Sequence, residues 1–117
     1  IIATHHKLDN LTLFVDRNNL MIDGPTEDIT SLEPIDAKFQ AFGWETITID
    51  GHNFAQIGEA IEKAQTIKGK PAVIICNTVK GKGVELFENQ AKWHYGGINS
   101  DLKAQALACL DKFYCEI

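Results

Sequence analysis

The chain is poor in several residue types, and each shortage excludes a class of protein. Three cysteines in 117 residues are too few for a disulfide-dense secreted domain, and their spacing matches no zinc site, so we expect all three to be reduced. No apolar run approaches the ~20 residues that span a membrane. The 11 Lys and Arg are outnumbered by 16 Asp and Glu, which argues against a nucleic-acid partner because phosphate binding requires a basic surface. The apolar start of the chain is too short for a signal peptide, so we expect a cytoplasmic protein without a membrane partner.

What is present is an alternation of strand and helix patterns. Short apolar runs rich in β-branched residues predict strands, and apolar residues at helical spacing predict helices. In the second helix these apolar residues are Phe54, Ile57, Ile61 and Ala64. The expected strands cover 11–15, 46–49 and 72–76, the expected helices 34–43, 54–66 and 101–113, and a loop covers 22–26. This order predicts an α/β fold, a parallel sheet with flanking helices.

The predicted sheet is small. Three strands fall short of the roughly five or six strands of an average sheet. The run 72–76 is apolar throughout, as in a strand covered on both faces, whereas the first strand has no predecessor to cover its other edge. We therefore expect the chain to form the back part of a larger domain.

Ligands of open parallel sheets collect at the carboxyl ends of the strands, where the loops 16–26, 50–53 and 77–95 begin. The first loop carries four carboxylate or amide side chains: Asp16, Asn18, Asn19 and Asp23. Magnesium takes six oxygen ligands and often shares them with phosphates. Turn chemistry explains the same residues equally well, because Asn and Asp tolerate left-handed backbone and bond their own main chain. Composition alone leaves both interpretations open.

The third loop contains two weaker signals. Lys80-Gly81-Lys82-Gly83 lacks the glycine spacing of a phosphate loop, so it predicts either an anion contact or an ordinary solvated loop. Further on, His94 lies between two aromatic residues and is followed by two glycines. A lone histidine of this kind is more often a packed or surface residue than a catalyst. Neither signal identifies a function by itself.

Taken in order, seven short segments resemble the diphosphate-binding domain of transketolases, above all those encoded as two subunits. The segments are Lys7-Leu8-Asp9-Asn10-Leu11, Val15-Asp16-Arg17-Asn18-Asn19-Leu20-Met21-Ile22-Asp23-Gly24, Ala41-Phe42-Gly43-Trp44, Ile49-Asp50-Gly51-His52, Lys70-Pro71, Thr78-Val79-Lys80-Gly81-Lys82-Gly83 and Trp93-His94. They extend over residues 7–94. The resemblance implies that the chain is the C-terminal part of that domain, with a partial thiamine diphosphate-binding fold.

The resemblance also implies a site. It assigns thiamine diphosphate and Mg²⁺ as cofactors, with Ca²⁺ or Mn²⁺ able to replace the magnesium. By position, the side-chain oxygen of Asn18 and the backbone carbonyl of Leu20 match the metal ligands. Ile22 matches an aliphatic residue against the thiazolium ring. Lys80 matches a lysine near cofactor and substrate, and His94 matches an active-site histidine that contacts the cofactor's phosphate side and the sugar.

The implied activity is the transfer of a two-carbon ketol unit from a ketose phosphate to an aldose phosphate, within pentose phosphate metabolism. A pyrimidine-binding subunit or domain is the implied partner, in a homo- or hetero-oligomer. Two departures stand out. The family's Gly-Asp-Gly, whose aspartate binds the metal, is not in this sequence, and Tyr95-Gly96-Gly97 replaces the expected continuation after His94.

Three alternatives remain. The chain could be a non-catalytic fragment or an interaction module, an interpretation that the missing Gly-Asp-Gly favours for this polypeptide by itself. It could belong to a related thiamine diphosphate enzyme such as dihydroxyacetone synthase or deoxyxylulose phosphate synthase. Two segments, Asp50-Gly51-His52 and Trp93-His94, favour transketolase over deoxyxylulose phosphate synthase. A nucleotide-binding doubly wound domain fits the topology, but such a domain has a Gly-x-Gly-x-x-Gly turn after a strand. None of the predicted strands is followed by this motif.

Overall fold

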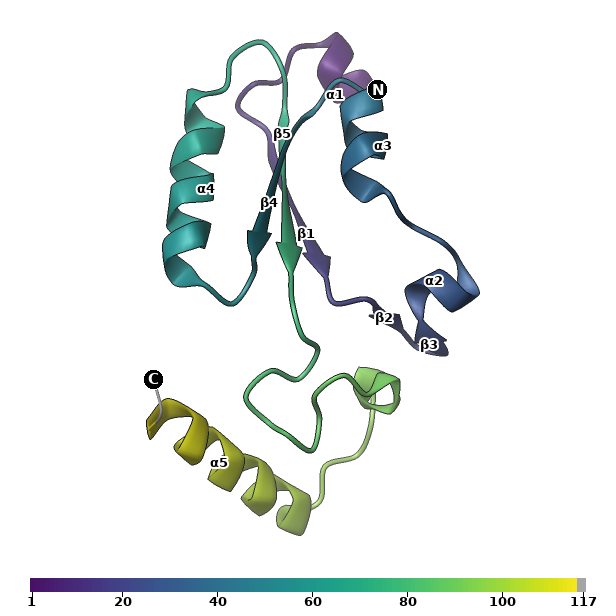
Figure 1. Ribbon diagram of the computed structural model, residues 1–117, viewed down its shortest axis with the longest axis vertical. Coiled ribbons are helices and arrows are strands. Elements are labelled where there is room, and N and C mark those ends of the chain that lie inside the picture. Colours follow the sequence, from purple (N-terminus) through teal and green to yellow (C-terminus); the bar gives the residue numbers. More distant parts are fainter. Residues whose placement is uncertain (116–117) are drawn as a thin grey trace. The chain divides into compact units, whose positions relative to one another are not determined.

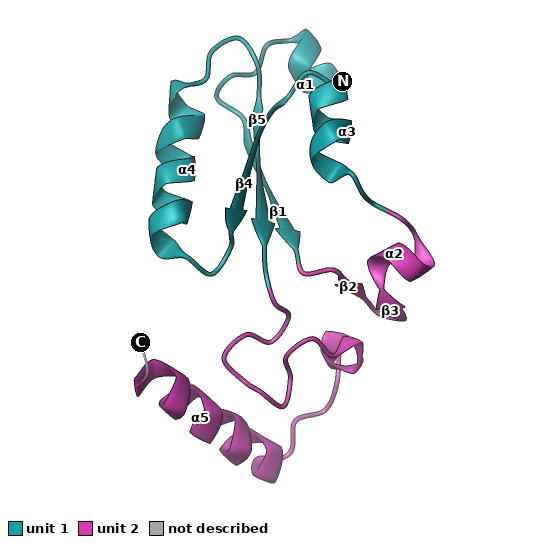
Figure 2. Ribbon diagram, viewed as in Figure 1, with its two compact units in different colours: residues 1–17, 32–78 teal, residues 18–31, 79–117 magenta. Residues whose placement is uncertain are grey.

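The computed structural model describes residues 1–115, and Figure 1 labels its α-helices and strands. The chain divides into two compact units, coloured in Figure 2. The first consists of Ile1–Arg17 and Leu32–Thr78, and the second of Asn18–Ser31 and the chain from Val79 onward. Within the described residues, no helix is long and apolar enough to cross a membrane.

The first unit is built on a parallel sheet of three strands. Their order is β1 (Thr12–Arg17), β5 (Ala72–Asn77) and β4 (Glu45–Asp50), so β5 enters between the two earlier strands. As predicted, β5 is the covered strand, and Val73 and Ile74 have no exposed surface. The structure confirms the α/β fold, and each strand ends one or two residues beyond its predicted end.

Two helices pack on opposite faces of this sheet. The helix α4 (Phe54–Thr66) covers the face that carries Ile47 and Ile49, which form the core with two of its alanines. Residues alternate between faces along a strand, so Thr46 lies on the other face. There it accepts a hydrogen bond of 2.8 Å from the side-chain amide of Gln40, in α3 (Ile35–Ala41).

The buried face of α4 differs from the predicted one. Phe54 is 89% exposed and Ile61 is 37% exposed, although both belong to the predicted apolar face. The side chains that pack against the sheet are Ala60, Ala64 and the half-buried Ile57. Alanine has only a methyl group, so a helix that presents alanines approaches a sheet closely, and this shifts the contact face away from the larger residues.

The outer edge of β1 has no neighbouring strand in the described residues. Its apolar side chains remain partly open, with Leu13 38% and Phe14 49% exposed. At the other edge of the sheet, Lys70 pairs with Glu45, and the ammonium group lowers the pKa of the Glu45 carboxyl. The exposed apolar side chains on β1 agree with the expected partial domain.

The strands end level with one another, since Arg17 and Asp50 both pair with Asn77. Several polar groups at this end are hydrogen-bonded within the fold. The hydroxyl of Thr78 donates to Asp16, and the carboxylate of Asp50 accepts from the N–H of His52 at 2.9 Å. Burial, reinforced by the charge of Asp16, raises the pKa of the Cys76 thiol beside them.

The second unit holds the remaining elements. They are the two-stranded hairpin of β2 (Leu20–Met21) and β3 (Gly24–Pro25), then α2 (Thr26–Ile29), the 3-10 helix η1 (Ala91–His94) and α5 (Ser100–Cys115). The sequence predicted α5 within two residues at each end, but it predicted 22–26 as a loop and did not separate η1 from the irregular segment. It also gave no signal for α1 (Ile2–His5), a single turn in the first unit.

Candidate functional site

The segment after β1 is a turn followed by a tight hairpin. The N–H of Leu20 donates to the Oδ1 of Asn18 at 2.9 Å, and Asn19 between them has a positive φ of 63°. Asparagine adopts this backbone more readily than most residues, and its amide commonly bonds the main chain two residues on. The turn-chemistry interpretation is therefore confirmed for both asparagines. The hydrogen bond from Leu20 uses only one of the two lone pairs of the Asn18 Oδ1, so this oxygen can still accept or coordinate a second group.

The pairing within the hairpin shows where the Leu20 carbonyl points. The N–H of Thr26 donates to the carbonyl of Asn19 at 3.0 Å, which makes these two residues a hydrogen-bonded pair. Bonded and non-bonded pairs alternate in antiparallel strands, so Leu20 and its partner Pro25 form a non-bonded pair. Proline also has no N–H to donate. The polar backbone groups of Leu20 therefore face away from β3, on the edge where Asn18 bonds it.

Two neutral carbonyl oxygens, Oδ1 of Asn18 and the backbone oxygen of Leu20, thus belong to one edge of this hairpin. Oxygen ligands of this kind suit Mg²⁺, Ca²⁺ and Mn²⁺, and two of them leave most of the coordination shell to other groups. No cluster of three His, Cys, Asp or Glu that could hold a metal occurs in residues 1–115. The donor set fits a metal shared with a diphosphate and does not fit a metal held by this chain alone.

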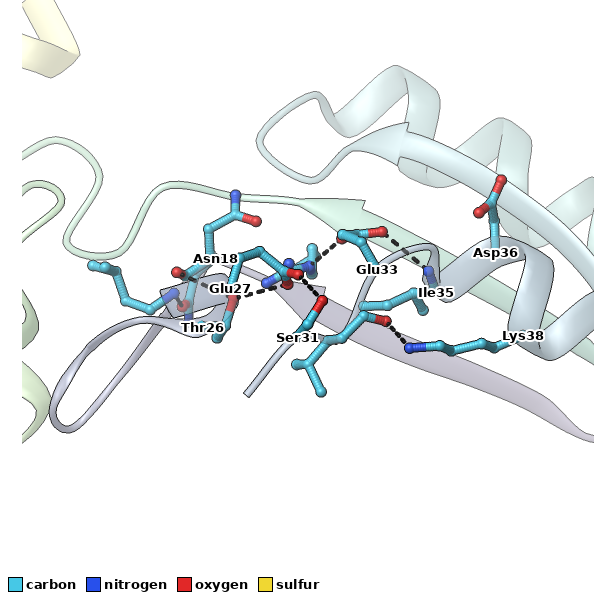
Figure 3. A network of polar contacts seen from close by, with 12 residues as sticks. Asn18, Thr26, Glu27, Ser31, Glu33, Ile35, Asp36 and Lys38 are labelled. Carbon is cyan, nitrogen blue, oxygen red and sulfur yellow. Dashed lines mark hydrogen bonds and ion pairs between the residues drawn. The ribbon is translucent and has the colours of Figure 1, made fainter. Parts of the chain in front are cut away.

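The hairpin ends in an exposed apolar tip. Ile22 is 55% exposed and precedes Asp23 in the connection between β2 and β3. An aliphatic side chain in this position is available to an apolar ring. Beyond the hairpin, the short helix α2 follows, and the hydroxyl of Ser31 donates to the carboxylate of Glu27 at 2.7 Å (Figure 3).

The two lysines of the third loop differ. Within residues 1–115 the ammonium of Lys80 makes no ion pair or hydrogen bond, whereas that of Lys82 lies 3.8 Å from Glu88 and 5.8 Å from the ring centroid of Phe113. Lys80 is half-buried, and its backbone carbonyl accepts from the N–H of Asn89 at 3.0 Å. Lys80 therefore offers a cation that no residue of the described chain neutralises.

The glycines beside these lysines serve packing. A Cβ at Gly81 would lie 2.8 Å from the backbone of Phe87, and Gly81 has a positive φ of 74°. A Cβ at Gly83 would lie 3.3 Å from Leu110 on α5, at a φ of 90°. The packing of the loop therefore accounts for both glycines, and of its two lysines Lys80 is the one whose ammonium has no partner in residues 1–115.

His94 ends η1, and its neighbour Trp93 anchors that helix. The Trp93 ring lies 4.5 Å from the Phe87 ring, centroid to centroid, and its Nε1–H donates to the Leu86 carbonyl at 3.1 Å. His94 itself is exposed, and its ring meets that of Tyr95 edge-on at 6.4 Å. The anchored tryptophan holds the histidine at the surface without burying it.

All five predicted site residues belong to the second compact unit: Asn18, Leu20, Ile22, Lys80 and His94. Nearly 60 residues of sequence separate the first three from the last two. The strand β2 lies in contact with η1, so the element of Leu20 adjoins the element of His94. Lys80 lies in the irregular segment between β5 and η1. The structure thus brings the hairpin residues and the histidine segment into one compact unit.

Other features of the described chain fall outside this set. A cavity of about 420 Å³ is lined by Gly83, Glu85, Glu88, Ala108, Cys109, Lys112 and Phe113, none of them a predicted site residue. The loop 50–53, a predicted ligand loop, has a structural role. Its residue Asn53 caps α4, because its side chain accepts a hydrogen bond of 3.1 Å from the N–H of Gln56. Sequence reasoning missed the hairpin itself, because its connecting residues, Ile22 and Asp23, do not form one of the dipeptides typical of two-residue hairpin turns.

Comparison with known families identifies the class of protein. The family model for the transketolase thiamine diphosphate-binding domain matches residues 1–112. The chain therefore belongs to the transketolase family, within its thiamine diphosphate-binding domain. This confirms the resemblance carried by the seven sequence segments.

Individual relatives are similar over much of this chain. A 6-deoxy-6-sulfo-D-fructose transketolase subunit from Clostridium sp. (strain MSTE9) is 41% identical over 110 residues, which cover 94% of this chain and 40% of that protein. An apulose-4-phosphate transketolase subunit from Phocaeicola vulgatus is 41% identical over 94 residues, covering 80% of this chain and 34% of that protein. The crystal structure of Campylobacter jejuni transketolase aligns with a TM-score of 0.80 at 31% identity, covering 96% of this chain and 20% of that one. The chain thus spans 40% or less of these relatives.

Proposed function

We propose that this chain supplies the metal-side part of a transketolase active site, which transfers a two-carbon ketol unit from a ketose phosphate to an aldose phosphate. Membership of the thiamine diphosphate-binding domain family supports this proposal. The observation that carries it in the structure is the hairpin edge on which the Asn18 amide and the Leu20 backbone lie together. We further propose a cytoplasmic enzyme of pentose phosphate metabolism.

The reaction exchanges one carbon–carbon bond for another. The bond between C2 and C3 of the ketose phosphate breaks, C3 becomes the aldehyde carbon of a shortened aldose phosphate, and C2 joins the aldehyde carbon of the acceptor. No net oxidation occurs. Thiamine diphosphate, when bound, supplies the group that accepts the electron pair of the breaking bond and returns it to the new one.

The chain's own residues would bind and orient. Asn18 Oδ1 and the Leu20 carbonyl would hold a divalent cation, and the cation would hold the diphosphate. The apolar side chain of Ile22 would lie against the thiazolium ring. The ammonium of Lys80 has no ion-pair or hydrogen-bond partner in residues 1–115. It would therefore bind a negatively charged group of the cofactor or of the sugar phosphate, since hydrogen bonds between charged groups are stronger than those between neutral ones.

His94 would contact hydroxyl oxygens of the sugar, since it is exposed and its segment adjoins β2. An imidazole can donate to an oxygen that gains charge during bond breakage and so lower the barrier. His94 is therefore assigned to turnover, and the hairpin residues to cofactor affinity.

We also propose that the complete site needs groups from outside residues 1–117. Mg²⁺ requires six ligands, and this chain offers two oxygens besides those of diphosphate and water. An aspartate from a Gly-Asp-Gly segment and a pyrimidine-binding subunit or domain would complete the site, in a homo- or hetero-oligomer. Two of the relatives named above are themselves transketolase subunits, which supports a split assembly.

A second candidate keeps the chemistry and changes the acceptor. A dihydroxyacetone synthase from Pichia angusta is 38% identical over 102 residues, covering 86% of this chain and 14% of that protein. Transfer of a two-carbon ketol unit to a one-carbon aldehyde gives dihydroxyacetone. Formaldehyde as acceptor therefore distinguishes the two candidates.

The test is an assay of the assembled enzyme, with thiamine diphosphate and Mg²⁺, on fructose 6-phosphate and glyceraldehyde 3-phosphate. We expect ketol transfer to the aldose phosphate and slower transfer to formaldehyde. In the same assay, His94→Ala should lower kcat roughly tenfold to several-hundredfold, because a lost active-site hydrogen bond costs about one to a few kcal/mol. Absence of transfer to both acceptors, or full turnover by His94→Ala with weakened cofactor binding, would contradict the proposal.

A further inference from the structure

We propose that Tyr95 binds the sugar substrate beside His94, with its phenol hydroxyl hydrogen-bonded to a hydroxyl or anionic oxygen of the sugar phosphate. Tyr95 would thereby determine substrate affinity, while His94 serves turnover. This inference rests on the proposed function, because it takes the side of η1 that carries His94 as the substrate side.

The exposure of Tyr95 is the first observation. The residue is 81% exposed, and its hydroxyl makes no hydrogen bond within residues 1–115. Tyrosine presents a polar tip on a rigid ring with few rotatable bonds, so it binds a partner with a small loss of conformational entropy. The exposed hydroxyl of Tyr95 is therefore available to hydrogen-bond a polar ligand.

The segment that carries Tyr95 is held on both sides. Before it, Trp93 packs on the Phe87 ring and donates to the Leu86 carbonyl at 3.1 Å. After it, the backbone of Gly96 passes so close to Trp93 that a Cβ there would lie 3.2 Å from the indole ring. A residue with a Cβ at 96 would press on the indole ring, which would have to move by a few tenths of an ångström. The two residues between these anchors are therefore displayed in a defined conformation.

The second observation is the relation of Tyr95 to His94. Their ring centroids are 6.4 Å apart and their planes meet at 82°, an edge-to-face geometry typical of paired aromatic rings. The backbone of Tyr95 is extended, with φ −150° and ψ 137°. Neither ring has a hydrogen-bond partner in the described chain, so one short segment carries two aromatic rings whose polar atoms are both available to a ligand. A polyhydroxylated, anionic chain offers several oxygens to such a pair.

The experiment compares Tyr95→Phe with Tyr114→Phe in the assembled enzyme. Both variants remove only a hydroxyl, and Tyr114 is a matched control because it is 71% exposed, contacts a neighbouring ring edge-on and lies on α5. We expect Tyr95→Phe to raise the KM for fructose 6-phosphate roughly two- to tenfold, the range for loss of one hydrogen bond. The kcat should stay within about twofold, and the affinity for thiamine diphosphate should not change. Tyr114→Phe should match the wild type.

Three results would overturn the inference: an unchanged KM for Tyr95→Phe, an equal rise for Tyr114→Phe, or a parallel loss of cofactor affinity. Measuring His94→Ala alongside separates this inference from the proposed function. If His94→Ala loses turnover while Tyr95→Phe keeps its KM, only the role of Tyr95 is wrong. If neither variant affects catalysis, the substrate side itself has been misplaced and both proposals fall. Tyr95→Ala, with its thermal unfolding recorded, should raise KM at least as far as Tyr95→Phe.

Discussion

The amide of Asn18 serves the fold and the proposed metal with one oxygen. Its Oδ1 accepts from Leu20, so Asn18→Ala removes a turn bond worth about 1 kcal/mol together with the proposed ligand. We expect the assembled enzyme to lose most of its Mg²⁺-dependent affinity for thiamine diphosphate, measured by titration of the apoenzyme. Asn19→Gly is the control, because glycine adopts the positive φ of residue 19 without strain. Equal affinities for wild type and Asn18→Ala would remove Asn18 from the site.

The two lysines of the third loop provide a second comparison at this scale. Lys80→Ala should weaken binding of the anionic cofactor or sugar phosphate, because it deletes a cation without an internal partner. Lys82→Ala should leave both affinities unchanged, since its ammonium is engaged with Glu88 and the Phe113 ring. The cost of Lys82→Ala should appear in stability and stay within about 1 kcal/mol, as for other exposed pairs. Calorimetric titration and urea unfolding of both variants separate these effects, and the opposite ranking would refute the assignment.

At the scale of elements, sequence patterns predicted what is long and periodic. The three strands and the helices α3, α4 and α5 each extend over six or more residues, enough for an apolar period to show. The hairpin strands have two residues each, too few for any period, and β3 contains Gly24 and Pro25, which suggest a loop. The site followed from the resemblance and could not follow from patterns. The proposed ligand at Leu20 is a backbone carbonyl, which no choice of side chain reveals.

The helix α4 offers a stability test of this level. Gly58 lies in its interior, and a Cβ there would meet no atom within 4 Å. We expect Gly58→Ala to raise the free energy of unfolding by about 0.5–1 kcal/mol, because alanine loses less conformational freedom in a helix. Urea unfolding measures this change. Gly81→Ala, whose Cβ would collide with the Phe87 backbone, should destabilise instead, and a loss of stability in Gly58→Ala would mean that α4 is packed differently.

At the scale of the whole molecule, the count of ligands limits what residues 1–117 do by themselves. They hold no cluster of three metal-binding His, Cys, Asp or Glu in the described range 1–115, and they offer Mg²⁺ two neutral oxygens on the hairpin edge. The ion prefers six oxygens in a nearly octahedral shell, and without an added carboxylate the positions that the diphosphate leaves open fall to water, which adds no charge to hold the ion. The open edge of β1, with Phe14 49% exposed, also leaves apolar surface and strand groups available to other chains.

We therefore predict that residues 1–117, expressed alone, bind thiamine diphosphate and Mg²⁺ too weakly to detect by calorimetry at millimolar ligand. They should also associate with increasing concentration, which sedimentation velocity measures. Supplying the proposed Gly-Asp-Gly segment and the pyrimidine-binding partner should restore binding and reduce association, because the first completes the metal shell and both cover apolar surface. Adding Mn²⁺ or Ca²⁺ in place of Mg²⁺ should not rescue the isolated chain, since these ions need at least as many ligands. Tight, metal-dependent binding of the cofactor by a monomer of 117 residues would show that the two hairpin oxygens suffice, and the split-site proposal would then be wrong.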